Sequence, residues 1–309
     1  MSEKVFTTIE DQISILQSRG VDFSDPSKID YAKTVLNECG YYNLVNGYNS
    51  LFLASAGNYK PGTTLNEIHA LYQFDRVLRE IFFRYILKVE THIKSLVSYY
   101  FSETHGHKNY LLYTNFNTSV KNAPDKIMSL ISEVQRQIAG RTSDPSIEHY
   151  IKNYGYIPMW VLSNILTLGQ VSKFYSLMLT PERQKVSRVF KIMDNELESI
   201  LIYISDIRNF CAHGNRLYCY RSRKPLIDLK QHALLSIAKS PSGEYVYGKR
   251  DLYASLIALR VLLSNNDYNR LVKEISTNIN RLNGKLSVIS IDDVLNEMGF
   301  PPNWKYMPK

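Results

Sequence analysis

The sequence has 309 residues, of which 44% are apolar and 21% are charged, and its formal net charge is +8. This composition is ordinary for a globular protein of one large or two modest domains and excludes a disordered or fibrous chain. Three cysteines are too few for a disulfide framework, and neither a signal peptide nor a membrane span is apparent, so we expect a cytoplasmic protein without membrane contact.

Apolar residues recur with helical spacing along nearly the whole chain. Gly20 ends the first predicted helix, and Thr64 begins the longest one. We expect helices over residues 8–19, 28–38, 65–104, 125–138, 146–153, 159–179 with a break at Gly169, 181–192, 195–213, 251–264, 267–282 and 291–298. We also expect a broken helical stretch over 41–53, a loop over 105–123, and a loop or small hairpin over 240–249.

The sequence therefore predicts an all-α fold in three consecutive parts. The first is an N-terminal helical segment (1–60), and the second is a helical bundle (61–220). The third is a basic loop followed by a C-terminal helical appendage (221–309). A Gly-rich phosphate loop, a Gly-x-Ser-x-Gly elbow and a His-Glu-x-x-His motif do not occur in the sequence, so nucleotide hydrolysis, esterase and zincin chemistry have no support.

The predicted helix over 195–213 carries the most informative residues. Its apolar side chains fall on one stripe, Leu197, Ile200, Leu201, Ile204, Ile207 and Cys211, and Arg208 lies within that stripe. An unpaired guanidinium in a core is very costly, so we expect either a buried carboxylate partner or a cleft at Arg208. His213 follows five positions later, about 140° around a regular helix, so the two side chains cannot converge on one atom from a straight helix of a single subunit. The structural interpretation is an ion pair at Arg208 and a helix cap at His213.

The predicted helix over 65–104 places a carboxylate in its apolar stripe. Asp75 shares the stripe with Leu71, Phe74 and Leu78. A buried carboxylate needs a cation, which either Arg208 or Arg79 can supply. A pair with Arg208 would support chemistry at the guanidinium, whereas a pair with Arg79 would be structural only.

Four segments give the chain a resemblance to a known family. They are Cys39–Tyr48, Leu71–Arg79, Ile157–Leu162 continuing to Leu168 and Gly169, and Ile207–Leu217, and together they lie within residues 36–220. In their order and spacing the chain resembles the HEPN nucleases, and more narrowly the bacterial abortive infection proteins of the AbiD/AbiF type. Two departures are Lys94, four residues after Glu90, where such proteins more often have arginine, and Tyr218, where tryptophan is commoner.

The resemblance implies a helical bundle of HEPN type with N-terminal and C-terminal helical extensions. It implies a ribonuclease that needs no metal or other cofactor, acts as a homodimer and arrests the growth of phage-infected cells. In this interpretation the catalytic residues are Arg208, which clamps the phosphate, His213, which acts as acid or base, and Asn209, which orients His213 or the phosphate. Asp75 is a supporting residue. The resemblance also implies control by a partner, with a regulatory small RNA as one candidate.

The positive charge is concentrated directly after the motif. Residues 206–250 hold nine basic and three acidic side chains. Phosphates can pair with such charges and unstacked bases can lie on interleaved rings, so we expect RNA to contact Arg216, Tyr218, Arg221, Arg223 and Lys224. The alternative is a solvated basic face.

Two other functions remain open at this point. One is a non-catalytic RNA-binding module that holds a regulatory small RNA, in which Arg208 and His213 only bind phosphate. The other is a helical adaptor that recruits another phage-defence protein.

Overall fold

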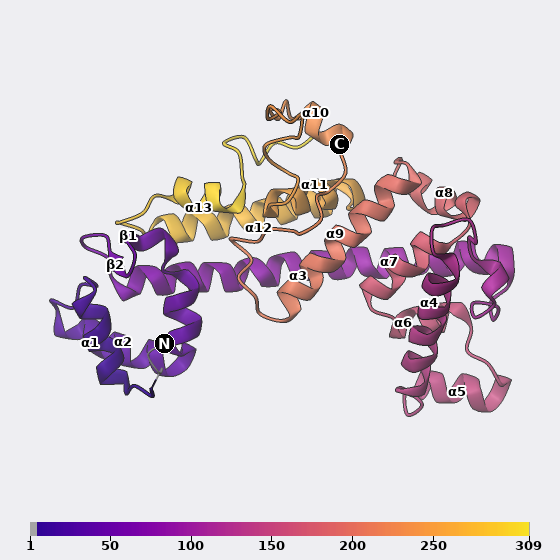
Figure 1. The fold of residues 1–309 in the computed structure, drawn as a ribbon, viewed down its shortest axis with the longest axis horizontal. Helices are drawn as coiled ribbons and strands as arrows, with labels where there is room; N and C mark the ends of the chain where they lie inside the picture. Colours follow the sequence, from indigo (N-terminus) through magenta and orange to yellow (C-terminus); the bar gives the residue numbers. More distant parts are fainter. Residues whose placement is uncertain (1–4, 309) are drawn as a thin grey trace. The chain divides into compact units, whose positions relative to one another are not determined.

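The computed structural model describes residues 5–308, and it confirms an all-α protein (Figure 1). The N-terminal elements are α1 (Ile9–Ser18), α2 (Pro26–Cys39), a π-helical turn η1 (Tyr42–Asn46), a 3-10 turn η2 (Ser50–Phe52) and the strands β1 (Leu53–Ser55) and β2 (Asn58–Tyr59). The long helix α3 (Leu65–His105) follows, and then η3 (Tyr113–Asn115), α4 (Ala123–Ala139), α5 (Pro145–Tyr154), α6 (Met159–Ile165), α7 (Leu168–Leu177), α8 (Thr180–Val189) and α9 (Asp194–Ala212). The remaining helices are α10 (Lys230–Leu234), α11 (Leu252–Leu262), α12 (Asn265–Asn283) and α13 (Ile291–Met298).

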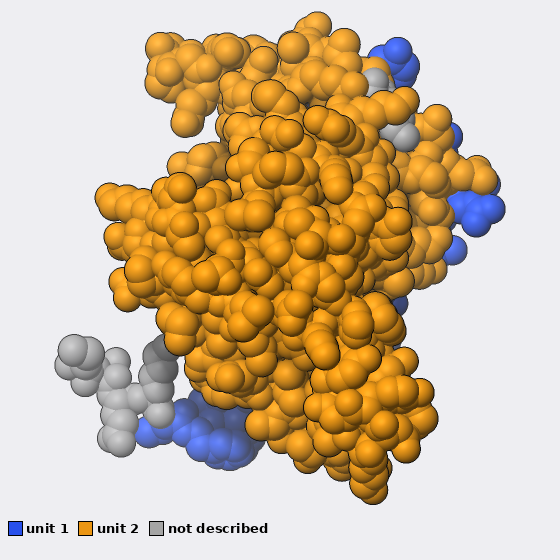
Figure 2. All heavy atoms as spheres, turned by 90° about the vertical axis from the view of Figure 1, so that its right-hand side faces the viewer, with its two compact units in different colours: residues 1–81, 214–220, 269–306 blue, residues 82–213, 221–268, 307–309 orange. Residues whose placement is uncertain are grey.

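The described residues divide into two compact units (Figure 2). Unit 1 contains the residues up to 81 together with 214–220 and 269–306, and unit 2 contains 82–213, 221–268 and the residues from 307. This division differs from the three consecutive parts expected from the sequence.

Polar contacts within unit 1 join segments that lie far apart in the sequence. Asn278 of α12 donates its side-chain amide to the carbonyl of Phe74 at 2.9 Å. The carboxylate of Glu67 accepts hydrogen bonds from the backbone N–H groups of Ser287 and Val288. Helical spacing along one segment carries no information about such partners, so the sequence could not reveal the role of the C-terminal helices.

In unit 2, α9 packs against α7, α8 and α11. The predicted stripe of α9 is confirmed, because Leu197, Ile200, Leu201, Ile204 and Ile207 are fully buried. Burial of this face fixes the rotation of α9 about its axis. It thereby sets the direction in which the side chains of the last two turns point.

Three local features differ from the expectation. The helix over 159–179 breaks at Thr167 rather than at Gly169, because Thr167 and Gln170 form a capping box that starts α7. The stretch over 41–53 is a broken helix as expected, with π and 3-10 turns, but it leads into an unexpected hairpin whose turn includes Gly57, with φ of +84°. The short helix α10 was not expected, whereas a bridge between Lys239 and Tyr245 confirms the small hairpin near 240–249.

In the part of the chain that the structure describes, no helix combines the length and apolar character needed to cross a bilayer.

Candidate active site

Arg208 lies in the last turns of α9, half-buried, beside a carboxylate from α3. Its Nε donates to Oε2 of Glu90 at 3.3 Å, and its guanidinium carbon lies 5.6 Å from the centre of the Phe83 ring. Lys94 contacts the other oxygen of the same carboxylate, with Nζ 2.7 Å from Oε1. The expected carboxylate partner of Arg208 is therefore present, and it is Glu90.

The pairing with Glu90 leaves most of the Arg208 donors unused. A guanidinium has five N–H donors, and the contact with Glu90 uses only the one on Nε. Among residues 5–308, neither Nη atom of Arg208 has a hydrogen-bond acceptor, and a quarter of the side chain is exposed. The planar fork formed by Nη1 and Nη2 matches the oxygens of a phosphate, so Arg208 is held in place and still able to bind an anion.

His213 caps the C-terminal end of α9. Its backbone N–H donates to the carbonyl of Asn209 at 3.0 Å, and Gly214 follows with φ of +69°, a conformation that favours glycine. Both His213 and Asn209 are exposed, and the His213 imidazole has no hydrogen-bond partner among the described residues. Since α9 continues without a break to Ala212, Arg208 and His213 point from different faces of one helix, as expected from their spacing.

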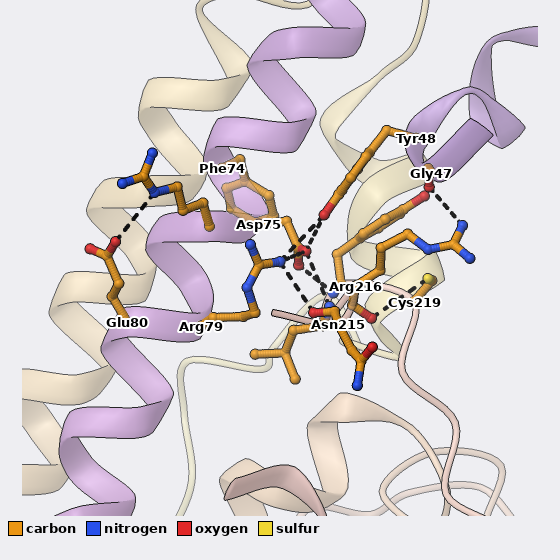
Figure 3. Close-up of polar contacts among 12 residues, drawn as sticks. Gly47, Tyr48, Phe74, Asp75, Arg79, Glu80, Asn215, Arg216 and Cys219 are labelled. Carbon is orange, nitrogen blue, oxygen red and sulfur yellow. Dashed lines mark hydrogen bonds and ion pairs between the residues drawn. The ribbon is translucent and has the colours of Figure 1, made fainter. Parts of the chain in front are cut away.

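Asp75 forms a separate cluster, which lies in unit 1 (Figure 3). Its side chain is fully buried, and Oδ2 accepts hydrogen bonds from the Tyr48 hydroxyl at 2.7 Å, from Nη1 of Arg79 and from the N–H of Leu217 at 3.2 Å. The other oxygen, Oδ1, accepts from the N–H of Tyr218 at 2.7 Å. We call these five residues the Asp75 cluster. Arg79 is thus the cation that pairs with Asp75, which is the structural alternative of the two expected from the sequence.

Burial controls the ionisation of the Asp75 cluster. Removal from water raises the pKa of the Asp75 carboxyl, while the Arg79 charge, the Tyr48 hydroxyl and the two N–H groups act in the opposite direction. Burial and the neighbouring carboxyl raise the pKa of Tyr48, so its hydroxyl keeps its proton and remains a donor.

Tyr218 does not fit the RNA-contacting role expected from the sequence. Its side chain is 1% exposed, and its ring stacks on that of Tyr48 with 5.6 Å between the ring centres. No face of the ring is open to a base, so this expectation needs correction. The neighbouring Arg216 is exposed, and its Nη1 donates to the carbonyl of Gly47 at 2.8 Å.

The other expected RNA contacts lie in unit 2. Arg221, Arg223 and Lys224 are exposed. The backbone around them is fixed, because Nη1 of Arg250 donates to the Arg223 carbonyl at 2.6 Å and the Ser222 hydroxyl donates to the Lys224 carbonyl at 2.7 Å. The side chains of Arg223 and Lys224 have no ion-pair partner among residues 5–308, which leaves them available to phosphate.

Glu90 was not singled out from the sequence as the partner of Arg208, although a signal was present. It lies between Ile86 and Ile93 on the α3 face that also contains Phe82 and Val97, and these four side chains are buried. Asp75 was identified because it is a carboxylate within an apolar helical stripe, and Glu90 has the same pattern. What periodicity could not provide was the pairing between two distant helices.

The chain was compared with known families, curated proteins and solved structures. Residues 34–219, more than half of the chain, match the model of a family described as Abi-like protein. No curated protein and no solved structure gives a match. The matched range includes Asp75, Glu90, Arg208 and His213 and ends before Arg221.

Proposed function

Because this chain belongs to the family of Abi-like proteins, we propose that it is a HEPN-type endoribonuclease that acts in abortive infection, where a phage-infected cell stops growing. The observation that carries this proposal is Arg208, which contacts Glu90 through Nε while neither Nη atom has an acceptor among the described residues. An exposed amide, Asn209, and an exposed imidazole, His213, lie within the same last turns of α9. These three types of side chain suffice to bind and cleave an RNA phosphodiester.

The reaction uses the 2′-hydroxyl of the substrate as its nucleophile. One His213 imidazole takes the proton of that hydroxyl while the 2′-oxygen bonds to phosphorus, and Arg208 binds the phosphate oxygens on which negative charge accumulates. The bond from phosphorus to the 5′-oxygen then breaks, and a protonated imidazole gives its proton to the leaving oxygen. The products are a 2′,3′-cyclic phosphate and a 5′-hydroxyl. DNA lacks the nucleophile and is not a substrate.

A second copy of the chain supplies the second imidazole in this proposal. Each chain has a single Arg208–His213 motif, and its two side chains point from different faces of α9. A two-fold axis beside the end of α9 would place two copies of the motif around one phosphodiester, so that one His213 acts as base and the other as acid. The homodimer is therefore part of the proposed mechanism.

Cleavage of RNA in a chelator tests the proposal directly. Total RNA is incubated in EDTA with the wild type, with His213→Ala, and with His149→Ala, which removes an exposed histidine on α5. We expect the wild type and His149→Ala to produce 5′-hydroxyl ends that polynucleotide kinase labels without phosphatase treatment. We expect His213→Ala to cleave about 10²-fold more slowly or worse, the usual loss when a general acid or base is removed. Cleavage that depends on added magnesium, or that survives in His213→Ala, would contradict the proposal.

The same experiment separates the second candidate, a non-catalytic module that holds a regulatory small RNA. The exposed, unpaired side chains of Arg223 and Lys224 favour RNA binding whether or not RNA is cut. Salt-sensitive binding without cleavage by the wild type would support the module. If the protein neither binds nor cleaves RNA, both candidate functions fail, and the remaining candidate is a helical adaptor that recruits another protein.

A further inference from the structure

Unit 2 contains a cavity that the proposed cleavage reaction does not use. Its volume is about 670 Å³, and its walls come from α3, the segment between α8 and α9, α10 and the junction of α11 with α12. A cavity of this size is typical of sites for small organic molecules.

The cavity carries an excess of positive charge. Lys88, Lys191 and Lys230 line it, and the only acidic lining residue is Asp267, which pairs with Lys88 at 2.6 Å. Lys191 and Lys230 are exposed and have no ion-pair partner in the described part of the chain. The imidazole of His92 adds another hydrogen-bonding group to the lining. Two unpaired ammonium groups at one cavity favour an anion.

Apolar side chains also line the cavity. Phe190 is half-buried and lies edge-on to the ring of His92, with 5.3 Å between the ring centres. Val189, Val261 and Leu262 continue this apolar surface. It can cover a flat, weakly polar group, which an inorganic anion alone would not provide.

A buried amide supplies the third feature. Gln231 is 2% exposed and lines the cavity, yet its Oε1 has no hydrogen-bond partner among residues 5–308. Buried polar atoms in proteins are almost always paired. Rotation about the Cγ–Cδ bond of Gln231, whose torsion has a broad energy minimum, would present Oε1 to a donor held in the cavity.

We propose that this cavity binds a nucleoside phosphate. The phosphate pairs with Lys191 and Lys230, the base lies against the wall that contains Phe190, and an N–H group of the base donates to Oε1 of Gln231. Each of the three features thus meets a different part of one ligand. The site goes beyond the proposed ribonuclease and does not depend on it, because Arg208 and His213 take no part in the binding.

Calorimetric titration of the full chain with AMP, GMP, CMP and UMP tests the proposal. The matched variants are Gln231→Leu, which removes the amide at nearly constant size, and the double variant Lys191→Asn with Lys230→Gln. Asparagine is chosen because Lys191 has φ of +58°, which asparagine tolerates. Lys126→Gln changes an exposed lysine on α4 and serves as the control. Thermal unfolding of each variant establishes that it is folded.

We expect at least one mononucleotide to bind with a dissociation constant below about 1 mM, and the corresponding nucleoside to bind at least about tenfold more weakly. We expect the double lysine variant and Gln231→Leu each to weaken binding by about tenfold or more, and Lys126→Gln to leave it unchanged. The absence of binding by all four nucleotides would overturn the proposal. Equal binding by the wild type and both cavity variants would also overturn it, as would binding that only RNA oligomers show.

Discussion

Two buried carboxylates, Glu90 and Asp75, each pair with an arginine, but they leave those arginines with different numbers of unused donors. Within residues 5–308, Arg208 contacts Glu90 through Nε alone, and neither of its Nη atoms has a hydrogen-bond acceptor. Arg79 uses its Nη1 on three acceptors, the Asp75 carboxylate, the Tyr48 hydroxyl and the carbonyl of Asn215. The first arrangement leaves Nη1 and Nη2 available as donors, and the second joins residues 214–220 to α3.

Glu90→Gln tests whether Glu90 positions Arg208 for cleavage. The amide keeps the shape of the side chain but loses the charge that orients the guanidinium, so we expect kcat to fall by about 10²-fold while KM changes little. RNA cleavage kinetics provide the measurement. Glu80→Gln on the same helix, where Glu80 forms an exposed pair with Arg76, is the control and should be indistinguishable from the wild type. An unchanged kcat in a folded Glu90→Gln protein would mean that the ion pair has no part in cleavage.

Asp75→Asn tests the structural interpretation of the Asp75 cluster. The variant leaves Arg79 beside a neutral group and turns one accepting oxygen into a donor that faces other donors, so we expect the free energy of unfolding to fall by about 3–5 kcal/mol. Tyr48→Phe removes one hydrogen bond and should cost about 1 kcal/mol. Urea unfolding followed by circular dichroism gives both values. Asp292→Asn at an exposed site of α13 should change stability by less than about 0.5 kcal/mol, and a similarly small effect at Asp75 would disprove this account.

At the scale of single elements, the sequence predicted most helices because their apolar residues recur with helical spacing. The helix expected over 195–213 is α9 (Asp194–Ala212), and the one expected over 65–104 is α3 (Leu65–His105). The features that the sequence did not predict depend on capping contacts and on elements too short to show a period. Reciprocal capping by Thr167 and Gln170 outweighs the flexibility of Gly169, and α10 is too short to show a period. At the candidate site, Arg208 was identified from the sequence, but its pairing with Glu90 and the burial of Tyr218 arise from contacts between distant segments.

The N-terminal cap of α11 should make stability depend on pH. Asp251 accepts hydrogen bonds from the N–H groups of Ala254 and Gly248, and its burial raises the pKa from 3.8 to about 6. A folded-state pKa above the unfolded value means that this contribution to stability is full below about pH 4 and is lost as the pH rises through 6.

Asp251→Asn removes this titration. The stability of the wild type minus that of the variant should therefore be greater at pH 4 than at pH 7, by about 2 kcal/mol. Urea unfolding at both pH values measures the difference. A difference that is constant, or that increases with pH, would show that Asp251 is not a buried carboxyl of raised pKa.

The basic segment after Tyr220 should set the salt dependence of RNA binding. Replacement of both Arg223 and Lys224 by glutamine removes two phosphate contacts, so we expect the slope of log K against log salt to decrease by about 0.7 for each on a single strand. Fluorescence anisotropy with a labelled RNA at several salt concentrations gives the slope. The double variant of Lys121 and Lys126, which are exposed near the start of α4, is the control. Equal slopes in all three proteins would identify the segment as a solvated face.

At the scale of the whole molecule, both units are assembled from segments that lie far apart in the sequence. Unit 1 combines the N-terminal elements with residues 214–220, most of α12 and all of α13, and α3 contributes residues to both units. Neither unit is a continuous stretch of chain, so truncation at 220 would remove part of each. For this reason the proposed active unit should be studied with full-length chains.

Mixing active and inactive chains tests the proposed dimer. His213→Ala chains are incubated in excess with the wild type, with RNA in excess over total protein, until subunits have exchanged. In a shared site every mixed dimer lacks one imidazole, so activity per wild-type chain should fall far below its value without the variant. Mass photometry records the dimer. Activity per wild-type chain that stays constant would show that each chain has an independent site.

The two loop N–H groups bound by Asp75 also give the protein a pair of built-in reporters. Residues 214–220 form no helix or strand, and amides in such segments usually exchange with deuterated water quickly. The N–H groups of Leu217 and Tyr218 are instead held by a carboxylate that water does not reach. These amides can exchange only when their hydrogen bonds to the Asp75 carboxylate break. Their protection against exchange therefore measures, in the unsubstituted protein, the free energy needed to open unit 1 around this buried charge.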